Sequence, residues 1–101
     1  MRIIVMLNPT NKYGTKTAYT KFRKALSADG FILIGPELFM RTTTTRKSAE
    51  THIRRLQDEH PDTGTIRILT LTERQFRSIK NLTGSIDHQE QDVGSNCIVM
   101  L

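Results

Sequence analysis

An asparagine ends the first apolar segment of the chain, at a position where a loop could hold a side chain over a sheet edge. The residues RIIVML (2–7) are followed directly by Asn8 and Pro9. Phosphodiester-cleaving sites often place carboxylates there to hold magnesium, a hard cation that prefers anionic oxygen ligands. Asparagine supplies only a neutral carbonyl, and no acidic residue lies between Met1 and Ala28. Asn8 is a candidate metal ligand, and the alternative is an Asn-Pro turn in which its side chain caps its own backbone.

A second candidate is a phosphate-binding surface around the starts of two predicted helices. Free backbone N–H groups and the helix dipole favour anions at such positions, and basic side chains add charge. The alternative is that threonines 43–45 only cap a helix while the basic side chains are solvated. The predicted DNA-binding residues are Lys12, Lys16, Arg46 and Lys47.

The remaining reactive residue types form no recognisable motif. His52, His60 and His88 are scattered, so we expect surface or helix-end positions for them. Cys97 is the single cysteine and cannot form an intramolecular disulfide, and no zinc spacing or glycine-rich nucleotide loop is present. The sequence therefore proposes no catalytic residue by motif.

The charge of the chain is unevenly distributed. The net charge is +5, and the residues through Arg55 contain eleven Lys or Arg against three acids, whereas the remainder contains four against seven. A basic half attracts polyanions such as nucleic acid, although it can also serve only as a solubilising surface. Aromatic residues are few, which favours phosphate contact over base stacking.

No apolar run is long enough for a membrane span and no signal peptide is evident, so we expect a cytoplasmic protein.

Hydrophobic periodicity predicts an alternation of strands and helices. Apolar residues indicate a central strand at 2–7, and helical spacing predicts a helix over 15–29 that ends at Gly30. Residues 31–41 form either a hairpin or one bent strand around Gly35-Pro36. A second helix begins after threonines 42–45 and ends before Pro61. A turn at 62–64 precedes a strand from 65, and residues 73–84 form a helical turn, a short extended segment around 79–82, or both.

This order predicts an α+β fold of the ferredoxin-like βαββαβ type, with an additional C-terminal strand. We expect residues 1–83 to form the ferredoxin-like domain. Residues 84–101 then form a polar linker and a strand, CIVML, that packs on a sheet edge, in our prediction that of a partner subunit in a homodimer. The predicted contacts with that subunit are Cys97, Ile98, Val99, Met100 and Leu101.

Three stretches carry a resemblance to a known family. They are YTKFRKALSADGFILIGPELFMR (19–41), IRILTLTERQF (66–76) and the closing apolar strand. Together they resemble the small CRISPR-associated adaptation protein, the second of the two core spacer-acquisition proteins, in a form similar to that of type II systems. The resemblance covers nearly the whole chain. The family that it indicates is also described as a CRISPR-associated endoribonuclease family.

The resemblance implies a homodimer that bridges integrase dimers and holds prespacer double-stranded DNA for insertion into a CRISPR array, a role in antiviral defence. It also implies a magnesium-dependent nuclease with an aspartate ligand at the end of the first strand. Asn8 occupies that position here. We therefore predict a DNA-holding scaffold that does not need catalysis. The alternatives are a magnesium-dependent endoribonuclease or endonuclease of the same family, and a toxin-like or regulatory RNA-binding domain.

Overall fold

The computed structural model describes residues 1–10 and 15–84 of the chain. Four strands and three helices alternate along this part of the sequence. In chain order they are β1 (Arg2–Asn8), α1 (Thr15–Ala28), β2 (Ile32–Gly35), β3 (Leu38–Thr42), α2 (Arg46–Glu59), β4 (Thr65–Leu71) and α3 (Glu73–Arg77).

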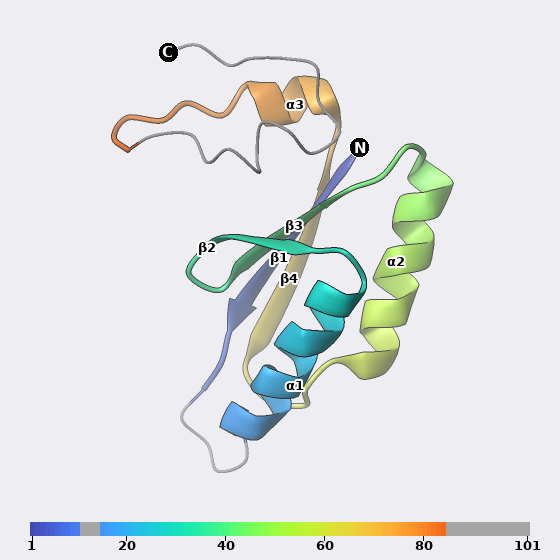
Figure 1. The fold of residues 1–101 in the computed structure, drawn as a ribbon, viewed down its shortest axis with the longest axis vertical. Coiled ribbons are helices and arrows are strands. Elements are labelled where there is room, and N and C mark those ends of the chain that lie inside the picture. Colours follow the sequence, from blue (N-terminus) through green and yellow to red (C-terminus); the bar gives the residue numbers. More distant parts are fainter. Residues whose placement is uncertain (11–14, 85–101) are drawn as a thin grey trace.

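The four strands form one antiparallel sheet in the order β2-β3-β1-β4, with β1 in the interior as predicted. In its register, Val5 lies opposite Phe39 of β3 and Ile68 of β4. Both long helices, α1 and α2, cover the same face of the sheet (Figure 1). This α+β arrangement is consistent with the predicted ferredoxin-like fold.

Alternation along β1 separates two faces of the sheet. Ile3, Val5 and Leu7 are buried in the core with residues of α1 and α2. Because successive strand side chains point to opposite faces, Arg2, Ile4, Met6 and Asn8 belong to the other side. We call this second side the open face because neither α1 nor α2 covers it, although Arg2, Ile4 and Met40 on it are buried. Directly opposed residues share a face, so Met40, Arg67 and Leu69 also belong to it. The residues packed between the sheet and the helices include Tyr19, Phe22, Leu26, Phe31, Phe39, Ala49 and Leu56.

The predicted end of α1 is confirmed by its hydrogen bonds. The Phe31 N–H donates to the Leu26 carbonyl at 3.0 Å, and the Gly30 N–H donates to Ser27 at 3.1 Å. These are the two bonds of a Schellman motif, in which Gly30 adopts a φ of 91°. The chain therefore leaves the helix directly toward β2.

The two loops flanking α2 also agree with the sequence. Thr45 is the N-cap, and its side chain accepts a hydrogen bond from the Ser48 N–H at 3.0 Å. The helix ends at Glu59, before Pro61, and Gly64 in the following turn has a φ of 77°.

Two alternatives left by the sequence are now decided. Residues 31–41 form a hairpin, because β2 and β3 pair antiparallel with the turn at Pro36 and Glu37. Residues 73–77 form α3, whereas no strand forms at 79–82. The predicted linker (84–96, apart from Gly84) and the C-terminal strand lie outside the described residues. In the described part of the chain, no helix has the length and apolar character needed to cross a membrane.

Candidate functional site

Asn8 ends β1 on the open face, directly opposite Thr65, the first residue of β4. Both side chains are exposed. They line one small cleft with Met6, Leu7 and Arg67, and no carboxylate of the described residues lines it. Nowhere among the described residues do three or more His, Cys, Asp or Glu side chains gather in a way that could hold a metal. An amide, a hydroxyl and a guanidinium are a poor donor set for magnesium, so the residues that one chain supplies here do not fit this cation.

The backbone around Asn8 is held by Tyr19 of α1. The buried Tyr19 hydroxyl donates a hydrogen bond of 2.6 Å to the Thr63 carbonyl. The neighbouring Gly64 leaves no room for a Cβ, which would contact this hydroxyl and lie 2.7 Å from the Asn8 carbonyl oxygen. Burial raises the pKa of Tyr19 above 10.0, and the Glu37 carboxylate raises it further while Arg23 lowers it. The end of β1 and the start of β4 are thereby fixed relative to α1.

The structure does not bring the predicted phosphate-binding residues into one patch. Lys16 lies in the first turn of α1, which follows the Asn8 end of β1, while Arg46 and Lys47 begin α2, which follows the end of β3. Since β1 and β3 are antiparallel, these two helix starts lie at opposite ends of the sheet (Figure 1). Lys16 therefore shares no single surface with Arg46 and Lys47, although all three lie at helix starts, and their binding of DNA stays a prediction. Lys12 lies outside the described residues.

At the Arg2 end of the sheet, Arg46 and Lys47 lie with further basic residues that the sequence analysis missed. β3 and β4 both finish there, since Thr42 and Leu71 are each opposite Arg2. The starts of α2 and α3 follow these two strand ends within a few residues. We call this surface the basic end, and its exposed cationic residues are Arg46, Lys47, Arg74, Arg77 and Lys80. The last three belong to the half of the sequence that is acidic by count, so only the strand pairing could identify them.

Arg2 itself contributes nothing to that surface because its side chain is buried. Its Nε atom lies 3.0 Å from Glu73 Oε2, and its Nη1 donates to Met40 Sδ at 3.4 Å. The guanidinium carbon also lies 3.8 Å from the centre of the Phe76 ring, a cation–π contact. The Glu73 carboxylate therefore neutralises the buried charge of Arg2, and it does not reduce the positive charge of the basic end.

Other arginines of the basic half are also engaged within the molecule. Arg23 pairs with Glu37 at 2.6 Å, and Arg55 pairs with Asp29 at 3.1 Å. The Asp29 carboxylate also accepts a 2.7 Å hydrogen bond from Nδ1 of His52. His52 is buried, which corrects the expected surface position, while His60 is an exposed helix-end residue as predicted. His88 and Cys97 lie outside the described residues. These pairs tie α1 to α2 and to the β2–β3 turn.

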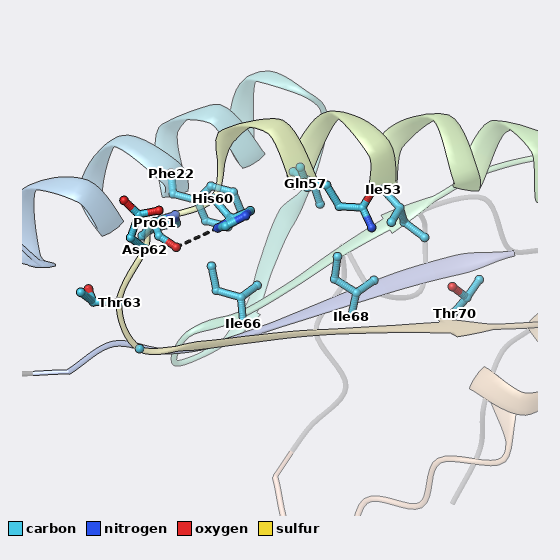
Figure 2. Close-up of a pocket in the computed structure, with 12 residues that line it drawn as sticks. Phe22, Ile53, Gln57, His60, Pro61, Asp62, Thr63, Ile66, Ile68 and Thr70 are labelled. Atoms are coloured by element: carbon cyan, nitrogen blue, oxygen red, sulfur yellow. Dashed lines mark hydrogen bonds between the residues drawn. The ribbon is translucent and has the colours of Figure 1, made fainter.

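An open cavity of about 550 Å³ lies between α2 and β4. Figure 2 shows Ile53 and Gln57 of α2 above Ile66, Ile68 and Thr70 of β4. β4 pairs only with β1 in the sheet of the described residues, so it is an edge strand, and its residues Ile66, Ile68 and Thr70 line this cavity. The edge of β4 offers backbone hydrogen-bonding groups, and the cavity offers apolar side chains. Together they suit an added strand.

The described residues thus define a small α+β domain with one helix-covered sheet face, one open face and separate basic surfaces.

No protein-family profile matches the chain. Curated proteins do match it, and those below carry the name "CRISPR-associated endoribonuclease Cas2". The one from Acidovorax ebreus is 35% identical over 101 residues, 99% of each chain. That from Parvibaculum lavamentivorans is 35% identical over 85 residues, 83% of this chain and 84% of the relative. That from Streptococcus mutans is 35% identical over 88 residues, 86% and 81% of the two chains. The chain belongs to the CRISPR-associated endoribonuclease Cas2 family.

Proposed function

We propose that this Cas2-family chain is a CRISPR adaptation protein that holds prespacer duplex DNA by its phosphates and bridges integrase dimers. The observation that carries the proposal is the separation of its basic surfaces. Lys16 lies at one end of the sheet, and the basic end lies at the other. Exposed cationic side chains at both ends of the sheet suit an extended polyanion better than a small anion.

The acting unit in this proposal is a homodimer formed through the open face. The apolar residues of this face are Met6 and Leu69, together with Ile4 and Met40, which are already buried in the single chain. Met6 and Leu69 remain 36% and 47% exposed in the single chain. A second copy would remove this apolar area from water, which favours association by about 25 cal/mol per Å² before the cost of binding.

The C-terminal segment is the proposed contact with a partner subunit or an integrase. Residues 97–101 are all apolar except for the thiol of Cys97. The outer edge of β4 and the cavity beside it offer a place for such a strand (Figure 2). A chain ending after Gly84 should lose capture of a purified CRISPR integrase. Capture that persists without the tail would place the integrase contact elsewhere.

The DNA-holding role is tested by removing charges in groups. We expect weaker binding of a labelled duplex, whatever its sequence, in two double variants, Arg46→Gln/Lys47→Gln and Arg74→Gln/Lys80→Gln. The single variant Lys16→Gln should lose less affinity than either double variant. Each lost phosphate contact should lower the slope of log Kobs against log salt by about one unit. Fluorescence anisotropy between 50 and 300 mM salt measures this, with Lys24→Gln on the outer side of α1 as the matched control. Unchanged affinity in all groups would contradict the proposal.

The alternative is a magnesium-dependent nuclease. The word endoribonuclease in the name of the relatives favours this alternative. In that case Asn8→Asp restores an anionic ligand at the end of β1. Chelator-sensitive cleavage of RNA or DNA by the purified variant, absent from Asn8→Ala, would show that the missing carboxylate alone limits catalysis. Under the scaffold proposal, Asn8→Asp cleaves nothing. Cleavage by the unaltered chain that is lost in Asn8→Ala would establish the nuclease instead.

A further inference from the structure

Two cavities between α1 and α2 join into one groove, which we call the helix groove. Their volumes are about 540 and 270 Å³, and Ala25 of α1 and Glu59 of α2 line both of them. The two helices lie side by side on one face of the sheet (Figure 1), so the helix groove is separate from the open face. It therefore stays accessible when a second copy covers the open face.

The floor of the helix groove is apolar and belongs mainly to α1. Ala18, Phe22, Ala25 and Ala28 line it, at positions that recur every three or four residues. This spacing places the four side chains on one side of α1, over about 15 Å at about 1.5 Å per residue. Three of the four are short, so another backbone can approach α1 closely. A row of this length fits about three turns of a further helix.

The rim of the helix groove carries negative charge on a chain whose net charge is +5. Asp58, Glu59 and Asp62 line its larger cavity, and all three are exposed. The four ion pairs of the described residues involve other acids, so these three carboxylates remain available to a ligand. Lys21 lines the same cavity, and the rim is still negative. The charge favours a cationic occupant.

Two other occupants have the wrong charge for this rim. The phosphates of a nucleic acid are repelled by three carboxylates. The C-terminal residues 85–101 contain Asp87, Glu90 and Asp92 but no lysine or arginine, so this segment does not complement the rim. A basic segment of a protein fits both the apolar floor and the acidic rim.

We propose that the helix groove docks a basic amphipathic helix of a protein partner. The apolar side of that helix packs on the alanine row of α1, and its lysines or arginines lie beside Asp58, Glu59 and Asp62. This surface goes beyond the DNA-holding role, because it uses neither the basic end nor the open face. The chain can therefore bind this partner together with a duplex and a second copy.

The test uses the full chain and a labelled synthetic peptide of about three helical turns, with leucines on one side and lysines flanking them. Fluorescence anisotropy should show binding of this peptide and much weaker binding of a scrambled peptide of the same composition. Asp58→Asn/Glu59→Gln/Asp62→Asn should weaken binding about tenfold, because three exposed charge contacts are lost. Ala25→Gln should also weaken it, since a longer side chain fills the floor without changing the charge.

Glu50→Gln is the matched control, because Glu50 is an exposed acid of α2 that lies outside the groove and enters none of the four ion pairs. It should change the affinity by less than about twofold. Titration of the isotope-labelled chain with the peptide should shift the backbone signals of Ala18, Ala25 and Ala28. Thermal unfolding of each variant confirms that the fold is intact.

Three results would overturn the proposal. Equal losses in the triple variant and in Glu50→Gln would show diffuse attraction, and so would equal binding of the scrambled peptide. Shifts confined to the open face would place the peptide elsewhere. Assemblies larger than a dimer, formed by the unaltered chain and absent from the triple variant, would show that a second copy occupies the helix groove.

Discussion

At the scale of single residues, the end of β1 depends on Tyr19, a buried residue of α1. Tyr19 is fully buried, yet its hydroxyl reaches the Thr63 carbonyl. Burying a hydroxyl is favourable only when it finds a partner, and here the partner belongs to the turn that positions Thr65. One hydrogen bond therefore links the core to the candidate site.

Replacing Tyr19 by Phe should destabilise the chain by about 1 to 2 kcal/mol at neutral pH, because the Thr63 carbonyl loses its donor. The pKa of Tyr19 is raised in the folded state, so above pH 10.0 the unfolded chain loses this proton before the folded chain does. The folded state then binds more protons, and the free energy of unfolding falls as pH rises. Chemical denaturation from pH 8 to 11 should show the advantage of Tyr19 over Phe shrinking above pH 10. A constant difference would argue against this linkage.

At the scale of elements, α3 is attached to the sheet through a buried arginine. The short helix begins with a capping box, in which Thr72 accepts from the Gln75 N–H and Gln75 accepts from the Thr72 N–H. Five helical residues are too few to be stable alone. Arg2, held between Glu73 and Phe76, supplies the tertiary contact that α3 needs.

Glu73→Ala should destabilise the chain by about 3 kcal/mol, because it leaves the buried Arg2 without its carboxylate. The double replacement Arg2→Met/Glu73→Gln should recover most of this loss, since no uncompensated charge remains buried. Glu59→Ala, at an exposed acid that ends α2, is the matched control and should change stability by less than about 0.5 kcal/mol. Urea unfolding of the four proteins measures these differences. A double variant no more stable than Glu73→Ala would contradict the electrostatic explanation.

At the scale of the whole molecule, the cations of the basic end and the exposed apolar residues of the sheet lie in different places, although Arg67 belongs to the open face. The cationic residues of the basic end follow the strand ends, whereas Met6 and Leu69 lie within the open face. This separation would let one surface bind a polyanion while another binds a second copy. The helix-covered face supplies the core and is not available for either role.

Leu69→Lys should therefore shift the chain from dimer to monomer, because it places a charge in the proposed interface. Leu33→Lys is the matched control, since Leu33 is 57% exposed but lies opposite Phe39, on the helix side of the sheet. Light scattering coupled to size exclusion, at several protein concentrations, measures the mass. A monomeric unaltered chain, or a dimer that survives Leu69→Lys, would argue against association through this face.

The sequence by itself determined the elements, because their signals are local. Helical spacing and the glycine at position 30 gave the bounds of α1 to within one residue, and Thr45 caps α2 as expected. The hairpin at 31–41 stayed undecided, since a Gly-Pro pair fits a turn or a bend equally well. The resemblance carried by local segments also identified the family to which the chain belongs.

Only the tertiary structure decided which distant residues meet. Arg2 is one of the eleven basic residues counted in the first half of the chain, but the structure buries it against Glu73. Antiparallel pairing sends Lys16 and Arg46 to opposite ends of the sheet, and it places Arg67 beside Asn8. Register and long-range pairing set these neighbours, and neither can be read from residue order because each depends on which strands lie side by side.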